Sequence, residues 1–335
     1  MAATPEFTRV LARLRNAAQP FPPGDLYQFS DLAGPDLAAL EAAWPEVALG
    51  RRRDLTDDLD EIGEADFELN FEAVFRLGLE DEDAAVRASA IHGLWEAEDP
   101  ALIVPLVDFM QHDPAVEVRA AAASALGRYV YLGELDDLPR PQARRVEDTL
   151  LDVVRGPDEV EVRRRALEAV AFSGREEIAS LIETAYASHD EKLRVSALFA
   201  MGRSADQRWA AHVQRELESE TQEVRFEAVR AAGELELEHA VEALTELVDD
   251  TDAAVRNAAI WSLSQVGGAE AARVLQRLLD EADDDETDYL EEALENLAFA
   301  DDVHSFALLA LGDDADGEQL DDEPDDDDDG DGVLN

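Results

Sequence analysis

The sequence contains 335 residues, of which 80 are Asp or Glu and 28 are Lys or Arg, and its formal net charge of −52 excludes a generic nucleic-acid-binding protein. Because 46% of the residues are hydrophobic, the chain can bury a core, which excludes an acidic chain that is disordered throughout. The sequence has no cysteine, and this excludes disulfides, Cys-based zinc sites and thiol nucleophiles.

The first 36 residues are predicted to form an N-terminal capping segment. The apolar residues between Phe7 and Leu14 have the spacing of a short amphipathic helix. A proline-rich stretch, QPFPPGDLYQFSDLAGP, follows this helix. Such a stretch can lie along the first unit of a repeat array and cover its apolar end. We therefore expect residues 1–36 to cap the array that follows.

From residue 37 onward the chain repeats one helical unit. A Val-Arg-x-x-Ala core, or a close variant of it, recurs at spacings of 32, 44, 31, 31 and 31 residues. The six copies begin at Val86, Val118, Val162, Leu193, Val224 and Val255. A weaker copy begins at Tyr289. The longest spacing holds about 13 extra residues, and we place this insertion near residues 129–141, where glycine and two prolines interrupt the pattern.

Each unit has the pattern of a helical hairpin. In ALTELVDD followed by TDAAVRNAAIWSLSQVGG, apolar residues recur at i, i+4 and i+8 on both sides of a short polar turn. Neither helix can bury its apolar stripe alone, so the hairpins must stack on one another. The sequence predicts an all-α fold, a right-handed α–α superhelix of about eight hairpins over residues 37–311. Residues 312–335 are almost free of apolar side chains and are predicted to be a disordered acidic tail.

The repeated units resemble HEAT repeats, and in particular the HEAT-like repeats first described in phycobilin lyases. The resemblance covers residues 37–300 and implies the solenoid fold. It implies no single function, because such repeats serve scaffolds, adaptors and lyase subunits alike. Stretches such as SALFAMGRSADQRW and AAIWSLSQVGG are also similar to a group of uncharacterised prokaryotic HEAT-repeat proteins.

No catalytic, cofactor-binding or metal-binding site is expected from the sequence. The histidines are scattered, and no HxxxH or HExxH spacing places two of them on one helical face. They are His92, His112, His189, His212, His239 and His304. No Gly-rich loop is followed by Lys-Ser or Lys-Thr. Paired carboxylates are expected by chance in a chain with 80 acidic residues, and we interpret them as solvated surface.

The arginine of the repeated core is expected to be structural. In three units an aspartate stands six residues before it, as in Asp81/Arg87, Asp113/Arg119 and Asp250/Arg256. This spacing places a carboxylate in the turn before the helix that carries the arginine. An anion-binding site is the alternative, but a ladder of side chains that braces successive turns explains the spacing better. The resemblance to HEAT repeats implies the same structural role.

The second helix of each hairpin is predicted to line a partner-binding surface. On a helical wheel that starts at the Val of the core, positions 2, 3, 6, 9 and 10 face away from the buried side. In HEAT solenoids the second helix lines the concave surface. The predicted partner-binding residues at these positions are Arg165, Phe199, Arg203, Phe226, Arg230 and Trp261. Exposed aromatic side chains bordered by arginine are typical of protein-binding hot spots. The alternative is that the aromatic residues pack between helices and that the arginines balance local acid.

Two classes of function stay open. The first is a non-enzymatic scaffold or adaptor that binds a protein partner with acidic and apolar residues along the concave face. The second is a lyase or a chromophore-handling chaperone, which is implied only by the resemblance to phycobilin-lyase repeats. The composition argues against the second, because it suits a halophilic cell type without phycobilisomes. We expect neither nucleic acid nor membrane as a partner, and we expect a monomer.

The charge also predicts the setting in which the protein works. Strong self-repulsion is screened at ~1 M salt, where the Debye length falls to about 3 Å. Lys192 is the only lysine, and all other cationic side chains apart from histidine are arginine. The sequence has no apolar run long enough to span a membrane, and its N-terminus lacks the features of a signal peptide. We therefore expect a cytoplasmic protein adapted to concentrated salt.

Overall fold

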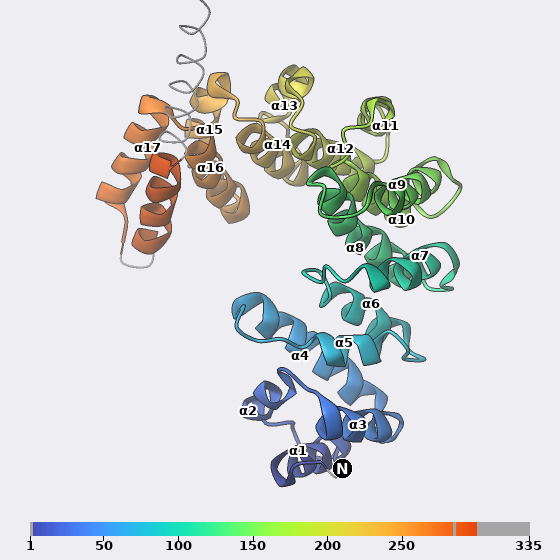
Figure 1. The fold of residues 1–335 in the computed structure, drawn as a ribbon. Coiled ribbons are helices and arrows are strands. Elements are labelled where there is room, and N and C mark those ends of the chain that lie inside the picture. Colours follow the sequence, from blue (N-terminus) through green and yellow to red (C-terminus); the bar gives the residue numbers. More distant parts are fainter. Residues whose placement is uncertain (1–2, 284–285, 300–335) are drawn as a thin grey trace, which may run out of the picture. The chain divides into compact units, whose positions relative to one another are not determined.

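The computed structural model describes residues 3–283 and 286–299, and these residues are built into helices and short connections (Figure 1). None of them forms a strand, so the predicted all-α solenoid class is confirmed. The chain divides into two compact units, Met1–Leu235 and Glu236–Asn335. No helix among the described residues is both long and apolar enough to cross a membrane. The predicted acidic tail, 312–335, and residues 300–311 of the predicted solenoid lie outside the described residues.

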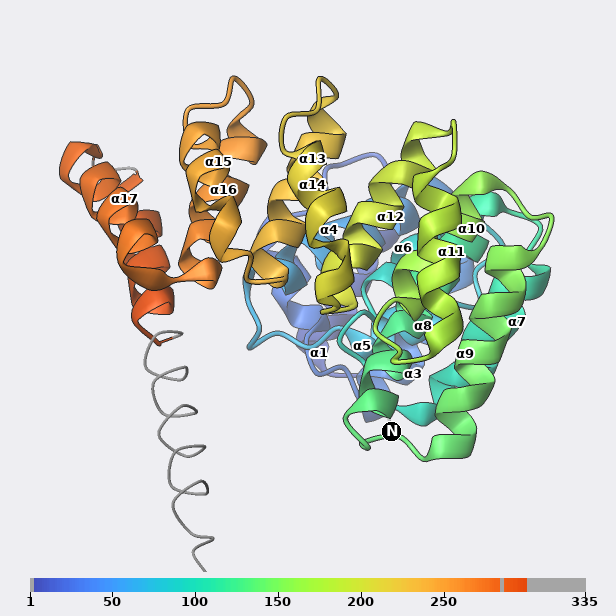
Figure 2. The same ribbon diagram turned by 90° about the horizontal axis from the view of Figure 1, so that it is seen from above.

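The first unit is a curved stack of hairpins that follow one another in chain order (Figure 1). Its helices are α1 (Pro5–Arg15), α2 (Pro23–Leu26), η1 (Tyr27–Phe29), α3 (Gly34–Ala43), η2 (Trp44–Glu46), α4 (Leu49–Ala65), α5 (Glu72–Gly78), α6 (Ala84–His92), η3 (Pro100–Leu102), α7 (Ile103–His112), α8 (Val116–Glu134), α9 (Arg140–Arg155), α10 (Val160–Val170), α11 (Glu176–Tyr186), α12 (Glu191–Arg203), η4 (Gln207–Trp209), α13 (Ala210–Glu216) and α14 (Gln222–Glu234). The second helices α6, α8, α10, α12 and α14 each pack on the first helix of their own hairpin, and successive second helices from α6 to α14 pack on one another. They lie on the inner side of the curve, and Figure 2 shows the hairpins α11–α12 and α13–α14 side by side.

The second unit contains the same kind of hairpin. Its elements are η5 (Glu238–Ala240), α15 (Val241–Leu247), α16 (Ala253–Val266) and α17 (Gly268–Glu281), and residues 286–299 are also helical. Helix α16 packs against both α15 and α17. Gly267 adopts a φ of 70°, in the region that glycine enters most easily, and it separates α16 from α17.

The repeated Val-Arg-x-x-Ala core forms the start of the second helices and places them in register. The valines of this core are fully buried, and so are the alanines four residues later, because positions i and i+4 share one helical face. Leu193, which replaces the valine in α12, is only half-buried. Several of these helices begin at an aspartate whose carboxylate accepts backbone N–H groups of the first turn, namely Asp83, Asp190 and Asp252. Such caps satisfy N–H groups that have no partner within the helix.

The arginine of the core braces the turns, as the sequence predicts. Arg87 Nη1 donates to the carbonyl of Asp81 in its own turn at 2.9 Å, and Nε and Nη2 donate to the carboxylate of Asp113 in the next unit. Arg119 repeats this arrangement with the carbonyl of Asp113 and the carboxylate of Asp158. The carbonyl bond recurs at Arg225 and Arg256. Asp81 and Asp113 therefore each serve their own unit through the carbonyl and the preceding unit through the carboxylate.

The segment predicted as an insertion continues the stack. Residues 129–134 extend α8, which reaches 19 residues, and α9 begins at Arg140. Helix α8 ends at Glu134, one residue after Gly133, and the lack of a side chain at Gly133 lets Ala143 of α9 approach. A Cβ atom at Gly133 would lie 2.5 Å from the Cβ atom of Ala143. The extension therefore adds length to the inner surface of the first unit.

The N-terminal segment covers the first end of this unit. Helix α1 buries Phe7, Val10, Leu11 and Leu14, in agreement with the amphipathic pattern. The ring of Phe7 meets that of the fully buried Phe29 edge to face, with centroids 5.6 Å apart.

Candidate protein-binding groove

A groove of about 840 Å³ lies along the inner side of the first unit. Its lining residues come from the end of α6 and the connection after it, from α8, from α10 and the connection after it, and from the end of α12. The aromatic side chains of this lining, apart from the imidazole of His92, are Trp95, Tyr131 and Phe172. Trp95 and Tyr131 are exposed. The groove therefore offers aromatic surface to a binding partner without any change in the packed core.

A continuous stack of arginine and aromatic side chains begins in the groove and extends beyond it. We call it the arginine–aromatic stack, and its members in spatial order are Arg128, Tyr131, Phe172, Arg203, Phe199, Arg230 and Phe226. Each guanidinium carbon lies 5.3 to 5.8 Å from the centroid of its ring neighbour, which is the range of cation–π contacts. The rings of Tyr131 and Phe172 meet edge to face at 5.7 Å. The stack thus connects the inner helices from α8 to α14.

Glycine permits the close helix approach on which the stack depends. Gly202 stands directly before Arg203 in α12, and a Cβ atom there would lie 3.0 Å from the Cα atom of Ala231 in α14. Gly127 stands before Arg128 in α8, and a Cβ atom there would lie 3.1 Å from the Cα atom of Ala169 in α10. Because these contacts involve backbone atoms, a larger residue would push the helices apart. Arg203 then meets the ring of Phe172, which follows α10, as well as that of Phe199 in its own helix, and Arg128 meets the ring of Tyr131 in its own helix.

Partly buried glutamates neutralise the arginines of the stack. Glu234 pairs with Arg203 at 3.3 Å and with Arg230 at 3.5 Å, and Arg230 also pairs with Glu227 at 3.5 Å. Burial raises the pKa of Glu227 and of Glu234 above the usual value, and the neighbouring arginines oppose this shift. Nε of Arg203 is buried without a hydrogen-bond partner among the described residues. The guanidinium of Arg203 is therefore held by aromatic faces as well as by a carboxylate.

The structure brings five of the six predicted partner-binding residues onto the inner surface of the first unit. Arg165 and Arg203 line the groove. Phe199, Phe226 and Arg230 belong to the part of the stack beyond it. All five are half-buried, so the rings are neither fully enclosed between repeats nor freely exposed.

The sixth predicted residue belongs to the second unit. Trp261 lies on α16, is half-buried, and its carbonyl accepts a hydrogen bond from Ser264 Oγ at 2.7 Å. Its place in one strip with the other five residues stays a prediction.

Four members of the surface, Trp95, Arg128, Tyr131 and Phe172, are absent from the predicted set. Arg128 occupies the same position in α8 as Arg203 does in α12, so this repeat position was a usable signal. Tyr131 lies in the extension of α8. Because the sequence predicts a break in the repeat pattern near residue 129, it assigns Tyr131 no position on the second helix. Trp95 follows α6 in a connection whose conformation no repeat pattern indicates.

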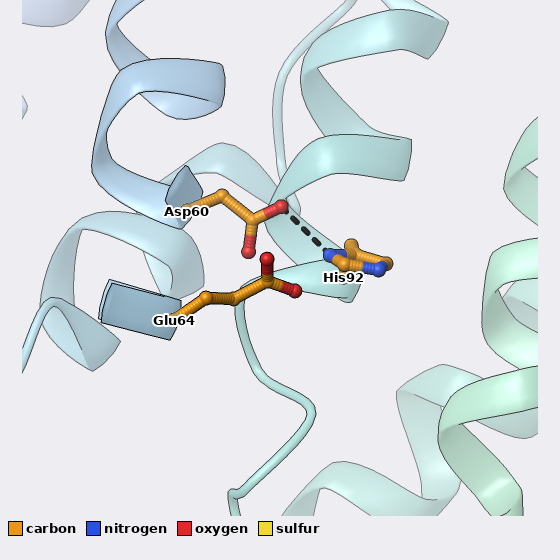
Figure 3. Close-up of side chains that lie close together, drawn as sticks. All are labelled: Asp60, Glu64 and His92. Carbon is orange, nitrogen blue, oxygen red and sulfur yellow. Dashed lines mark hydrogen bonds and ion pairs between the residues drawn. The ribbon is translucent and has the colours of Figure 1, made fainter. Parts of the chain in front are cut away.

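A second cluster of polar side chains lies between α4 and α6 (Figure 3). Asp60 and Glu64 project from α4, and Nδ1 of His92 lies 2.7 Å from a carboxylate oxygen of Asp60. This hydrogen bond raises the pKa of His92 above its usual value. One ligand atom from each of the three residues lies within 4.8 Å of the others. Motifs within one helix, such as HxxxH and HExxH, do not indicate this cluster, because His92 is 32 residues from Asp60.

The sequence matches the family model described as HEAT repeats over residues 72–140 and 210–298. The chain therefore contains HEAT repeats. The matched ranges include the hairpins α5–α6 and α15–α16, so repeats of this family occur in both units. A search of curated proteins finds no relative with significant sequence similarity.

Solved structures with a similar fold also consist of helical repeats. The complex of CpcE and CpcF of phycocyanin lyase from Nostoc sp. PCC7120 is 17% identical, with a TM-score of 0.44, and the match covers 68% of this chain and 94% of that chain. The Kap95:Nup1 complex is 14% identical, with a TM-score of 0.44, and the match covers 95% of this HEAT-repeat protein and 50% of that chain. A designed armadillo repeat protein in complex with the peptide (KR)4 is 17% identical, with a TM-score of 0.38, covering 60% of this chain and 100% of that chain. At these values the likeness carries no argument about function.

Proposed function

We propose that this HEAT-repeat protein is a non-enzymatic scaffold that binds an extended segment of a partner protein in the groove of its first unit. The observation that carries the proposal is the reversed charge balance of the groove. Its lining has the three arginines Arg128, Arg165 and Arg203 against the two glutamates Glu117 and Glu161. The whole chain, by contrast, has 80 acidic residues against 28 Lys and Arg.

The chemistry of the lining specifies the partner segment. Exposed aromatic side chains next to arginine form the kind of surface on which a few residues carry most of the binding energy. Arginine binds carboxylates through two parallel hydrogen bonds, and its weakly hydrated guanidinium stacks on rings. These contacts are short-range, so they persist in salt that screens long-range attraction. The expected occupant is therefore a protein segment with both carboxylate and apolar side chains.

The proposal is for a monomeric, cytoplasmic scaffold that works in concentrated salt. The net charge of −52 supports the adaptation to salt, because screening removes most of the self-repulsion of such a chain.

A peptide selection tests this function. We would select displayed random peptides on the purified full chain in molar KCl and measure the affinity of the enriched peptides for variants. We expect enriched peptides that contain Asp or Glu beside Leu or aromatic residues. Phe172→Ala should weaken their binding by about 2 kcal/mol, or roughly 30-fold, because Phe172 is a central ring of the groove.

Matched controls lie outside the groove on the same unit. Tyr27 is 52% exposed, and Tyr27→Ala should leave the affinity unchanged. Arg165→Ala should weaken binding, whereas Arg144→Ala, at an exposed position of α9, should not. Equal affinity of the selected peptides for Phe172→Ala and for Tyr27→Ala would remove the groove as the binding site.

A further inference from the structure

We propose that Asp60, Glu64 and His92 form a binding site for a divalent transition-metal ion, with Zn²⁺ as the expected ion. The site is independent of the proposed scaffold function, although His92 also lines the groove. Two helices that pack against each other, α4 and α6, supply the ligands. In Figure 3 the two carboxylates and Nδ1 of His92 point toward one another.

The helical geometry brings the three ligands together. Asp60 and Glu64 are four residues apart on α4, so they lie on one face of the helix. His92 is the last residue of α6, and its Nδ1 atom lies 2.7 Å from Oδ2 of Asp60. With all three ligand atoms within 4.8 Å of one another, small rotamer changes bring them to the distance that a shared ion requires. The ion would take the place of the proton between His92 and Asp60.

The local electrostatics favour a cation at this point. The carbonyl end of a helix carries a partial negative charge, and cations there are stabilising. Glu64 stands in the last turn of α4, which has no basic residue, and His92 stands at the same end of α6. Glu64 has no hydrogen bond or ion pair with another described residue. A bound cation would offset the negative charge of the two carboxylates and the partial negative charge at the ends of the two helices.

The donor set selects the class of ion. An imidazole nitrogen with two carboxylates suits zinc and related transition metals, whereas Mg²⁺ and Ca²⁺ prefer oxygen ligands alone. The imidazole also distinguishes this site from the many carboxylate pairs on the surface of the protein. Three protein ligands leave the fourth position of a tetrahedral zinc ion open to water.

The test is a titration of Co²⁺, as a visible-absorbing substitute for Zn²⁺, into the full chain without any partner. Molar KCl and excess Mg²⁺ suppress binding to ordinary surface carboxylates. We expect one Co²⁺ per chain with a visible band that Zn²⁺ abolishes. His92→Ala should remove the band and lower the affinity by more than about 10-fold, since even loss of an outer hydrogen-bond partner costs that much.

Two further variants make the result decisive. Glu64→Gln changes an exposed side chain that has no hydrogen bond or ion pair with another described residue, so it leaves the fold intact, and it should also weaken Co²⁺ binding by about 10-fold or more. His112→Ala is the matched control, because His112 also faces a carboxylate, Asp108 at 3.1 Å, but has no third ligand among the described residues. Its affinity should equal that of the unmodified protein. Unchanged Co²⁺ binding by Glu64→Gln or by His92→Ala would overturn the site, and this outcome would leave the peptide-binding proposal untouched.

Discussion

The arginine–aromatic stack should stabilise the fold measurably, and Phe199 is its most informative member. The ring of Phe199 lies between two guanidiniums, 5.3 Å from Arg203 and 5.6 Å from Arg230. Among the residues that the structure describes, the ring of Phe226 has one such neighbour, Arg230 at 5.8 Å. Leucine at either position keeps most of the apolar volume and removes the aromatic face. Comparing the two substitutions therefore isolates the number of cation–π contacts.

The magnitude follows from counting those contacts. At partly exposed sites one cation–π contact contributes ~0.5–1 kcal/mol. Both rings are half-buried, so the small loss of packing should be similar in the two variants. Phe199→Leu should therefore lower the free energy of unfolding by about 0.5–1 kcal/mol more than Phe226→Leu does.

Urea unfolding in molar KCl, followed by far-UV circular dichroism, measures these differences. Urea is uncharged and leaves the ionic screening unchanged. Stacked repeats can unfold in parts, so only variants with the same denaturant slope are compared. A double-mutant cycle with Phe199→Leu and Arg230→Met should give a coupling energy between the two side chains of roughly 0.5–1 kcal/mol. Arg230→Met also leaves Glu227 and Glu234 without this partner, but that cost appears in both arms of the cycle and cancels. A coupling of zero would refute the energetic role of the stack.

Two other predictions concern charge. Asp83→Ala should lower the free energy of unfolding by about 1 kcal/mol at neutral pH, because Asp83 caps α6 and binds Arg53. Arg53 lowers the pKa of Asp83 to about 2, so this contribution is present above the ordinary pKa of an aspartate and is lost as the pH falls through about 2. Urea titrations of the protein and the variant should therefore converge at that pH. Dilution from molar to millimolar KCl should unfold the protein, because at ~0.01 M the screening length reaches about 30 Å and the charge of −52 is no longer screened; a melting temperature independent of KCl would contradict this.

The fold was predictable because one short pattern fixes the register of every hairpin. The buried valine and the buried alanine four residues later define the core-facing side of the second helices that carry the pattern, and an arginine such as Arg87 binds the turn before its helix. The extension of α8 was harder to predict. Gly133 and the two prolines near it mark the break between α8, which ends at Glu134, and α9, which begins at Arg140, but the glycine also permits the close contact with Ala143. Local residue preferences do not distinguish these two uses of glycine.

The sites were only partly predictable because they are built between repeats. Stacking places equivalent residues of successive hairpins side by side, so a contact between hairpins appears in the sequence as a pair about one repeat period apart. Phe172 and Arg203 are 31 residues apart, and so are Phe199 and Arg230. Asp60 and His92 are 32 residues apart, which equals the spacing between the first two copies of the core. Motif searches within one helix, such as the search for HxxxH, do not detect such pairs. In a repeat protein, residues that form one site can therefore be spaced by the repeat period as well as by one helical turn. The pairs Phe199/Arg230 and Asp60/His92 have the first spacing, and Asp60/Glu64 have the second.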